Sequence, residues 1–403
     1  MKKYLILISL IAVLVSGCLM IEAGDEPIHT VLDPPDPSWL REDFQMPETE
    51  QPETAELEDE LDPETPTEPD ASITISAVGD IIGSTENFQS VKSGDVYEFS
   101  GHFRELRDTF QHHDYTIANL VSPIAGADFS YSGYPTYNAP IELVQAVADI
   151  GIDALSTANR YAFDLGQRAV MSNLNNIRDI GLTPFGTATS QEEADQPVII
   201  DVKGIKLGLL SYTDLLNQSI ANMPYAVSIA ERSKIETDID QLRQNGAELI
   251  VVNMYWGDEY ADMPNAEQTG LMSFLESQGV DIVLGSHPHV VQPMVIKNIV
   301  YQGETKPMVQ AYSLGNFYSA FLMNRTKTGL MLEIDIARQN GRAAVSDVRH
   351  KLLYNHQTDR GDGLLDFRVI DLATLEERRN DSQYNQMRQE RDRVEELLHA
   401  LDQ

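Results

Sequence analysis

Short apolar runs alternate with amphipathic segments along most of the chain after residue 71. Apolar, β-branched runs of about four to eight residues predict buried strands, and apolar residues three or four positions apart predict helices. The strands expected on this basis cover 72–78, 114–119, 152–156, 182–187, 198–202, 205–211, 248–253, 282–284, 309–313, 329–336 and 344–349. Helices are expected near 137–150, 166–180, 228–245 and 266–278. This alternation predicts an α/β fold with polar residues gathered at strand ends.

Two histidines, His287 and His289, follow the apolar run 282–284 after a Gly-Ser step. The run predicts a buried strand that opens into a loop. Side chains two positions apart in an extended segment point the same way, so both imidazoles are expected to reach one site. Ligands of open α/β sheets bind at the carboxyl ends of strands. The alternative, two loop histidines beside a proline turn, stays open because a lone H-x-H motif is unspecific.

Further polar or aromatic residues follow other expected strands. Asp80 comes after the strand 72–78, where a carboxylate is well placed for catalysis or metal binding, although an isolated Gly-Asp is more often a turn. The remaining candidates for a cleft at these strand ends are Asn119, Asn159, Arg160, Tyr161, Tyr255, Trp256, Glu259 and Asn316.

The amino-acid composition argues against some classes of function. The chain has 403 residues and a hydrophobic fraction of 42%, enough for a substantial core in one large domain or two. Its net charge of -34 argues against nucleic-acid binding, which needs clustered Lys and Arg. The single cysteine, Cys18, excludes an internal disulfide.

The first 18 residues have the pattern of a secretory signal. Two lysines precede an apolar run that ends at Val15 and is too short for a comfortable membrane span. The segment Val15-Ser-Gly-Cys18 resembles a bacterial lipobox. That resemblance implies cleavage before Cys18, a lipid on its thiol and an anchored protein on the extracytoplasmic face of the cell membrane. The alternative is an ordinary signal peptide with a chance cysteine.

Two further segments flank the expected domain, 72–372. Residues 19–71 form an acidic, proline-rich linker, with thirteen acidic side chains against one Arg in 41–70. Such a segment cannot bury enough apolar surface to order itself, so we interpret it as a tether. Residues 373–403 predict a charged helix with a narrow apolar stripe, more typical of a helix packed on its own domain than of a coiled coil.

Seven short motifs between Ile73 and Ile336 together resemble the capsule-synthesis CapA family, or poly-gamma-glutamate synthesis proteins. They are Ala-Val-Gly-Asp80, Ala-Asn119-Leu, Tyr-Asn-Ala-Pro140, Ser-Thr-Ala-Asn159, Trp256-Gly-Asp-Glu259-Tyr, Gly-Ser-His287-Pro-His289-Val-Val-Gln-Pro and Tyr-Ser-Leu-Gly-Asn316-Phe. The resemblance implies a calcineurin-like metallophosphoesterase fold, a four-layer α-β-β-α sandwich.

Four positions depart from the pattern of the family. Val121 stands where the family usually has Glu, Arg160 where it has Asn, and Tyr161 and Tyr255 where it has His. Valine offers no lone pair, and a guanidinium repels a cation and keeps its proton. Since active members of the superfamily use two divalent metals, we expect lost or reduced two-metal hydrolysis.

The potential metal ligands that this chain retains could bind one divalent metal or none. Asp80, His287 and His289 are the candidate ligands, with water or Glu86 completing the shell, although three mixed ligands are marginal. Arg160, together with Tyr161 and Tyr255, suggests an anion-binding pocket for a polyanionic surface polymer. The structural alternative is that Arg160 pairs with Asp164 or Glu259.

Two functions follow from these expectations. The first is a lipid-anchored protein that acts in the synthesis or handling of capsule, poly-gamma-glutamate or a related surface polymer, with a membrane polymer-synthesis complex as the partner that the resemblance implies. The second is an active one-metal hydrolase that cleaves a phosphoester or a polyglutamyl bond.

Overall fold

The computed structural model describes residues 70–401, which belong to one compact unit of the chain, Glu64–Gln403. The signal segment, Cys18 and all of the linker before residue 70 lie outside the described residues.

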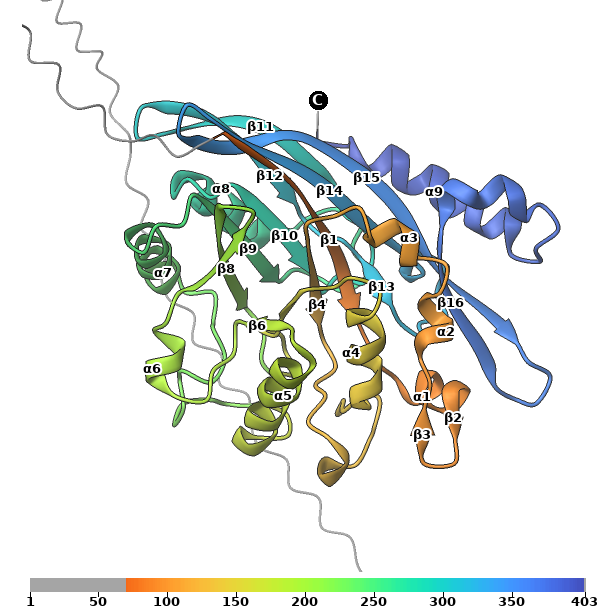
Figure 1. Ribbon diagram of the computed structural model, residues 1–403. Coiled ribbons are helices and arrows are strands. Elements are labelled where there is room, and N and C mark those ends of the chain that lie inside the picture. Colours follow the sequence, from red (N-terminus) through yellow and green to blue (C-terminus); the bar gives the residue numbers. More distant parts are fainter. Residues whose placement is uncertain (1–69, 402–403) are drawn as a thin grey trace, which may run out of the picture. The chain divides into compact units, whose positions relative to one another are not determined.

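Two mixed sheets form the centre of the described unit (Figure 1). The first has the order β16-β15-β14-β1-β4-β5-β6, with β13 paired to β1, and the second has the order β11-β12-β10-β9-β8-β7. The first sheet comprises β1 (Ala71–Ile81), β4 (Tyr115–Leu120), β5 (Ala154–Ser156), β6 (Thr183–Phe185), β13 (Asn316–Tyr318), β14 (Thr328–Gln339), β15 (Arg342–Asp359) and β16 (Leu365–Asp371). The second comprises β7 (Val198–Val202), β8 (Ile205–Thr213), β9 (Leu249–Tyr255), β10 (Ile282–Ser286), β11 (Met294–Tyr301) and β12 (Glu304–Ala311). A short pair, β2 (Lys92–Ser93) and β3 (Val96–Tyr97), stands apart from both sheets.

Helices connect the strands. The α-helices are α1 (Thr85–Val91), α2 (Ser100–Phe103), α3 (Arg107–Phe110), α4 (Ile141–Ala148), α5 (Gln167–Ile180), α6 (Gln191–Ala194), α7 (Arg232–Gln244), α8 (Ala266–Ser277) and α9 (Tyr384–Leu398). Three 3₁₀ turns complete the set: η1 (Ala127–Phe129), η2 (Asn324–Thr326) and η3 (Leu372–Arg378).

Three apolar clusters define four layers. One cluster lies between the sheets and joins Ile75 and Ile117 of the first sheet to residues of the second such as Val251. The outer face of the first sheet packs on α1 to α5, and the outer face of the second packs on α7 and α8. Strand residues alternate between these faces, as the pleat requires. The predicted α-β-β-α sandwich is confirmed.

Two strands run further than the apolar runs indicated. β1 continues through Asp80, whose backbone pairs with Asn316 and Asn119 in parallel register, and β9 continues to Tyr255. Both residues therefore lie within strands and not after them. Backbone pairing with neighbouring strands extends these elements past the end of the apolar pattern, which the sequence pattern alone does not reveal.

The charged C-terminal helix buries its apolar stripe on this unit. Met387, Val394 and Leu398 of α9 join the cluster between the sheets, together with Leu372 and Leu375 of η3. The helix therefore contributes to the core of the described unit.

Close backbone contacts at three glycines bring the strand ends together. A Cβ on Gly79 would lie 1.9 Å from the carbonyl oxygen of Gly315, and one on Gly285 would lie 1.8 Å from that of Tyr312. Gly315 itself has φ +65°, a conformation that favours glycine. Candidate site residues come one or two positions after each of these glycines, so the contacts also position the site.

Substitution of Gly285 tests this packing. We expect Gly285→Ala to lower the free energy of unfolding by about 3 kcal/mol, because the methyl group would overlap a backbone carbonyl that cannot move freely. Urea denaturation of the purified protein measures the effect. Gly101→Ala in α2 is the control, since no atom of another segment would lie within 4 Å of the added methyl group. Equal effects of the two substitutions would contradict the packing argument.

Candidate functional site

Asp80 is the centre of a buried polar network at the ends of the strands. The Asn119 side-chain amide donates to Asp80 Oδ1 at 2.8 Å, and the backbone N–H of His287 lies 3.4 Å from Asp80 Oδ2. The Nδ1 of His289 lies 3.5 Å from the same Oδ2 and 3.1 Å from Asn316 Oδ1. The structure therefore brings together Asp80, both histidines and two of the predicted asparagines.

The two histidines reach this site from a bent loop and not from an extended segment. Their φ angles are +96° for His287 and +59° for His289, both in the left-handed region that non-glycine residues rarely adopt. Their ring centroids are 5.8 Å apart. The two imidazoles lie close together, but two strained backbone conformations, and not the alternation of a strand, aim the rings.

Two other predicted residues have structural partners. The side-chain amide of Asn159 donates to the carbonyls of Leu120 and Thr157, and its oxygen accepts from the backbone of Tyr161. Trp256 is fully buried and donates from Nε1 to the carbonyl oxygen of Tyr312 at 2.9 Å. Both side chains stabilise the loops that border the cleft.

Three of the four residues that depart from the family pattern belong to an apolar cluster beside Asp80. It consists of Ile82, Val121, Tyr137, Tyr161 and Tyr255, all buried, with Phe321 packed against them. Tyr137 and Tyr161 meet edge to face, with ring centroids 4.8 Å apart. Apolar contacts therefore occupy the position where the family pattern places a carboxylate and histidines.

Tyr255 closes the inner side of this cluster. Its ring lies 4.6 Å from that of His287, and its hydroxyl is buried without a hydrogen-bond partner among residues 70–401. Burial, reinforced by the charge of Asp80, raises the pKa of Tyr255 well above its ordinary value. The phenol therefore stays protonated and adds no anionic oxygen to the site.

Arg160 is held by neighbouring side chains at the mouth of the site. Its Nη1 donates to Glu259 Oε1 at 2.9 Å and its Nε donates to Asn217 Oδ1 at 3.2 Å. Asn217 in turn donates to Asp164 Oδ2 at 2.9 Å. The guanidinium also lies 5.6 Å from the ring centroid of Tyr161. These contacts match the structural alternative for Arg160, pairing with Glu259 directly and with Asp164 through Asn217.

Glu259, His287 and His289 form a group that fits a divalent metal. One potential ligand atom from each lies within 4.8 Å of the others. His287 Nδ1 is buried and has no partner within the described chain, and burial, with His289 and Arg160, lowers the pKa of His287 to about 3. A neutral imidazole with a free nitrogen is the form that binds metal. Asp80 adjoins this group through its contact with His289.

A second metal does not fit. Asn159 uses both atoms of its side-chain amide on the backbone, and Val121 has no donor atom. The Asn119 amide nitrogen is bound to Asp80, which leaves its buried Oδ1 as an isolated ligand atom. A two-metal centre needs a full shell on each ion, and the residues present supply one incomplete shell.

Two clefts adjoin the site. One has a volume of about 440 Å³ and reaches His289 between aromatic side chains, with Glu86 at its edge. The other has a volume of about 520 Å³ and is lined by polar groups that include Arg160, Asp164 and Asn217. The expected metal ligand Glu86 therefore faces the aromatic cleft and is absent from the close metal-binding group.

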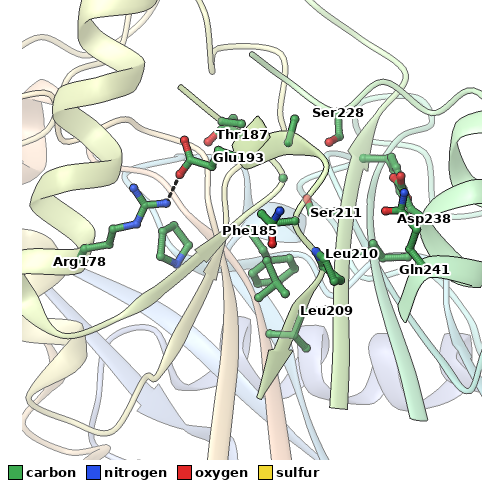
Figure 2. A pocket seen from close by; sticks show the side chains of 18 residues that line it. Arg178, Phe185, Thr187, Glu193, Leu209, Leu210, Ser211, Ser228, Asp238 and Gln241 are labelled. Carbon is green, nitrogen blue, oxygen red and sulfur yellow. Dashed lines mark hydrogen bonds and ion pairs between the residues drawn. The ribbon is translucent and has the colours of Figure 1, made fainter. Parts of the chain in front are cut away.

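A separate small cavity lies between β6 and β8 (Figure 2). Its volume is about 80 Å³, and Figure 2 shows an ion pair between Arg178 and Glu193 on one side of it. Ser211 on its wall also bonds Ser156. The cavity shares no lining residue with the site, and its size suits a few water molecules.

The family profile described as "Bacterial capsule synthesis protein PGA_cap" matches residues 74–320, more than half of the chain. The chain belongs to this family. The matched segment includes every candidate site residue from Asp80 to Asn316.

Two relatives are about a quarter identical to this chain over the aligned residues. The chain is 26% identical over 285 residues to the capsule biosynthesis protein CapA of Bacillus anthracis, covering 68% of this chain and 66% of that protein. It is 27% identical over 291 residues to the PGA biosynthesis protein CapA of Bacillus subtilis strain 168, covering 69% and 71%. The chain thus spans just under two thirds of the length of the first relative.

Two solved phosphoesterase and nucleotidase structures are similar to this chain at low sequence identity. The calcineurin-like phosphoesterase YfkN from Bacillus subtilis matches with 12% identity, a TM-score of 0.43 and coverage of 80% of this chain and 100% of that one. The NAD nucleotidase NadN of Haemophilus influenzae matches with 9% identity, a TM-score of 0.41 and coverage of 82% and 61%.

Sequence reasoning missed Asp214, at the end of β8. Its backbone N–H donates to the carbonyl oxygen of Tyr255, and its Oδ1 is buried without a partner among the residues described. Burial, followed by the charge of Glu267, raises the pKa of Asp214 to about 6. The only signal in the sequence was the position of Asp214 directly after an apolar run. No recognisable motif surrounds this residue.

Asp214 makes stability depend on pH. Because the carboxyl of the unfolded chain ionises near 3.8 and that of the folded chain near 6, stability falls as the pH rises through this window. We expect Asp214→Asn to raise the free energy of unfolding by about 2 kcal/mol at pH 7, after allowance for partial exposure, and by much less at pH 4. Denaturation at both pH values measures this. The same gain at pH 4, or an equal gain in the exposed control Asp128→Asn, would contradict the assignment.

Proposed function

We propose that this member of the PGA_cap family acts in the synthesis or handling of capsule, poly-gamma-glutamate or a related surface polymer without two-metal hydrolysis. The observation that carries the proposal is the apolar cluster around Tyr255 and Val121 beside Asp80. A two-metal hydrolase needs anionic and imidazole ligands at these positions to hold a second ion and its water. The names of the two CapA relatives support the polymer-related role.

The polar contacts around Asp80 support a binding role because they compensate its carboxylate within the protein. Asn119, His289 and the His287 backbone all engage the carboxylate, which leaves its charge compensated by donors. The cleft above this network opens to solvent through aromatic and acidic groups. A ligand can therefore be held at the cleft without chemistry at Asp80.

The second candidate function is a one-metal hydrolase that cleaves a phosphoester or polyglutamyl bond. The Glu259, His287 and His289 group favours it, because three ligands with an open position resemble catalytic single-metal sites. When bound, the ion would supply Lewis-acid activation of a water or carbonyl. Against this, Glu259 is already paired with Arg160, so a metal would compete with the guanidinium for the charge of that carboxylate.

Metal content and hydrolysis separate the two functions. We expect the full chain, purified and supplied with Mn²⁺ or Zn²⁺, to cleave a chromogenic phosphodiester no faster than His287→Ala does, and to hold at most one ion. Elemental analysis and product absorbance provide the measurements. His112→Ala, which removes an exposed histidine outside the site, is the matched control and should not change hydrolysis or metal content.

A hydrolytic rate that exceeds that of His287→Ala by an order of magnitude or more, with a stoichiometric ion lost in that variant, would establish the one-metal hydrolase instead. Two bound ions per chain would contradict the proposal that the second site is lost.

We also propose that Cys18 carries a lipid and holds the domain at the extracytoplasmic face of the membrane. The lipobox-like Val15-Ser-Gly-Cys18 and the acidic linker after it support this. Among residues 70–401, no helix is long and apolar enough to cross a membrane. A membrane polymer-synthesis complex as partner, and an anionic polymer as ligand, stay predictions.

A Cys18 variant tests the anchor. We expect the wild-type chain, produced in a bacterium that processes lipoproteins, to enter the detergent phase on Triton X-114 separation. Cys18→Ser should enter the aqueous phase or keep an uncleaved signal segment, because buried acyl chains provide the anchoring free energy. Mass spectrometry of the N-terminal peptide provides the second measurement. An unmodified Cys18 in the wild-type protein would refute the lipid anchor.

A further inference from the structure

The larger part of the cleft above His289 is walled by aromatic rings set at steep angles to one another. Tyr134 and Tyr137 meet at 69° with centroids 6.5 Å apart, and Tyr137 and Tyr161 meet at 82° with centroids 4.8 Å apart. Phe321 and Tyr260 lie on the far side, 4.8 and 6.1 Å from the ring of His289. Rings at such angles present both faces and edges to the 440 Å³ space between them.

The charged groups around this space are mainly acidic. Glu86 lines the cleft and forms no ion pair within residues 70–401. Glu259 lines it as well and is paired with Arg160, while Asp164 belongs to the adjoining polar cleft. These three carboxylates outnumber the one guanidinium, so the two adjoining clefts carry an excess of negative charge.

The site already holds a cation against an aromatic ring. The Arg160 guanidinium lies 5.6 Å from the ring centroid of Tyr161, within the distance at which the negative face of a ring attracts a cation. Tyr161 also lines the aromatic cleft, where no Lys or Arg is among the lining residues. The aromatic cleft therefore has the same electrostatic preference without a cation of its own.

We infer that the aromatic cleft is a binding site for an organic ammonium group, with Tyr137 and Tyr161 as its walls, Tyr134 at its rim and Glu86 as its counter-ion. Aromatic faces attract a quaternary or primary ammonium through their quadrupoles, and a nearby carboxylate adds direct Coulomb attraction. The space is within the range of about 300–1,000 Å³ that is usual for small-ligand sites. His289 lies at the base, so a bound ammonium would approach the polar network around Asp80.

Two other ligand classes suit the cleft less well. An anion would meet Glu86 and Glu259, and the single nearby guanidinium is already bonded to Glu259 and Asn217. A neutral apolar ligand would gain from contact with the rings alone and would make no use of the charge of Glu86. An ammonium uses both the rings and the carboxylate.

This inference rests on the proposed role of the cleft as a binding site and adds the class of ligand. The test is a calorimetric titration of the purified full-length protein with tetramethylammonium chloride and with butylammonium chloride, at ionic strength matched by NaCl. The first probe reports a quaternary ammonium and the second a primary one. We expect saturable binding of at least one probe, with a dissociation constant on the order of 1 mM.

Variants identify the groups responsible. Glu86→Gln and Tyr134→Leu should each weaken binding by about three- to tenfold, since each removes one attraction of the size expected for a cation–π or screened charge pair. Both residues are exposed or at the rim, so the fold should persist, and thermal melting checks this. Glu192→Gln on α6 removes an equal charge from an exposed site elsewhere and should leave the dissociation constant unchanged.

Three results would overturn the ammonium site. They are the absence of saturable binding of both probes, binding of neutral tert-butanol as tight as that of tetramethylammonium, and an unchanged dissociation constant in Glu86→Gln. Binding of acetate in place of either ammonium would indicate an anion site at Arg160 instead. A protein that binds ammonium and also hydrolyses phosphodiesters would contradict the proposed function and leave the ammonium site intact.

Discussion

The close approach of backbone to backbone at the glycines of the strand ends is the constraint on which the rest of the site depends. Gly79, Gly285 and Gly315 lie where a side chain would overlap a carbonyl or a neighbouring strand. Each contact lets β1, β10 and the turn before β13 converge more tightly than side chains permit. Asp80 and Asn316 come directly after Gly79 and Gly315, and His287 comes two residues after Gly285. The packing of the backbone at these glycines therefore sets the positions of the three site residues.

The converging strand ends hold a compensated carboxylate beside an apolar cluster. Asp80 is compensated by hydrogen bonds from Asn119 and by contacts with His289 and the His287 backbone. Beside it, Val121 and Tyr255 bury apolar surface at positions that a two-metal site would fill with ligands. Burial of apolar groups stabilises these strand ends, whereas unfilled carboxylates and imidazoles in the same space would cost free energy.

Much of the site was predictable because its residues follow apolar runs. The positions of Asp80, Asn119, His287, His289 and Asn316 at adjacent strand ends came from hydrophobic pattern and motif order, which report local structure well. The third member of the close metal-binding group, Glu259, was proposed only as a cleft residue, because its loop reaches His287 and His289 through tertiary packing. Tyr161 and Glu259 were expected in a cleft, but its aromatic lining was not predicted, since Tyr134 and Phe321 lie far apart along the chain and neither belongs to a motif.

The sequence by itself determined the α/β layering, the family, and the loss of ligand types at Val121, Arg160, Tyr161 and Tyr255. Side-chain chemistry and hydrophobic period are properties of the chain that need no partner. Only the tertiary structure decided what the replacements do: Tyr255 packs on His287, and Arg160 pairs with Glu259. It also decided the angle of the two imidazoles, because positive φ values depend on the packing around the loop. Contacts between distant segments set the charge and shape of the cleft, and no local pattern encodes them.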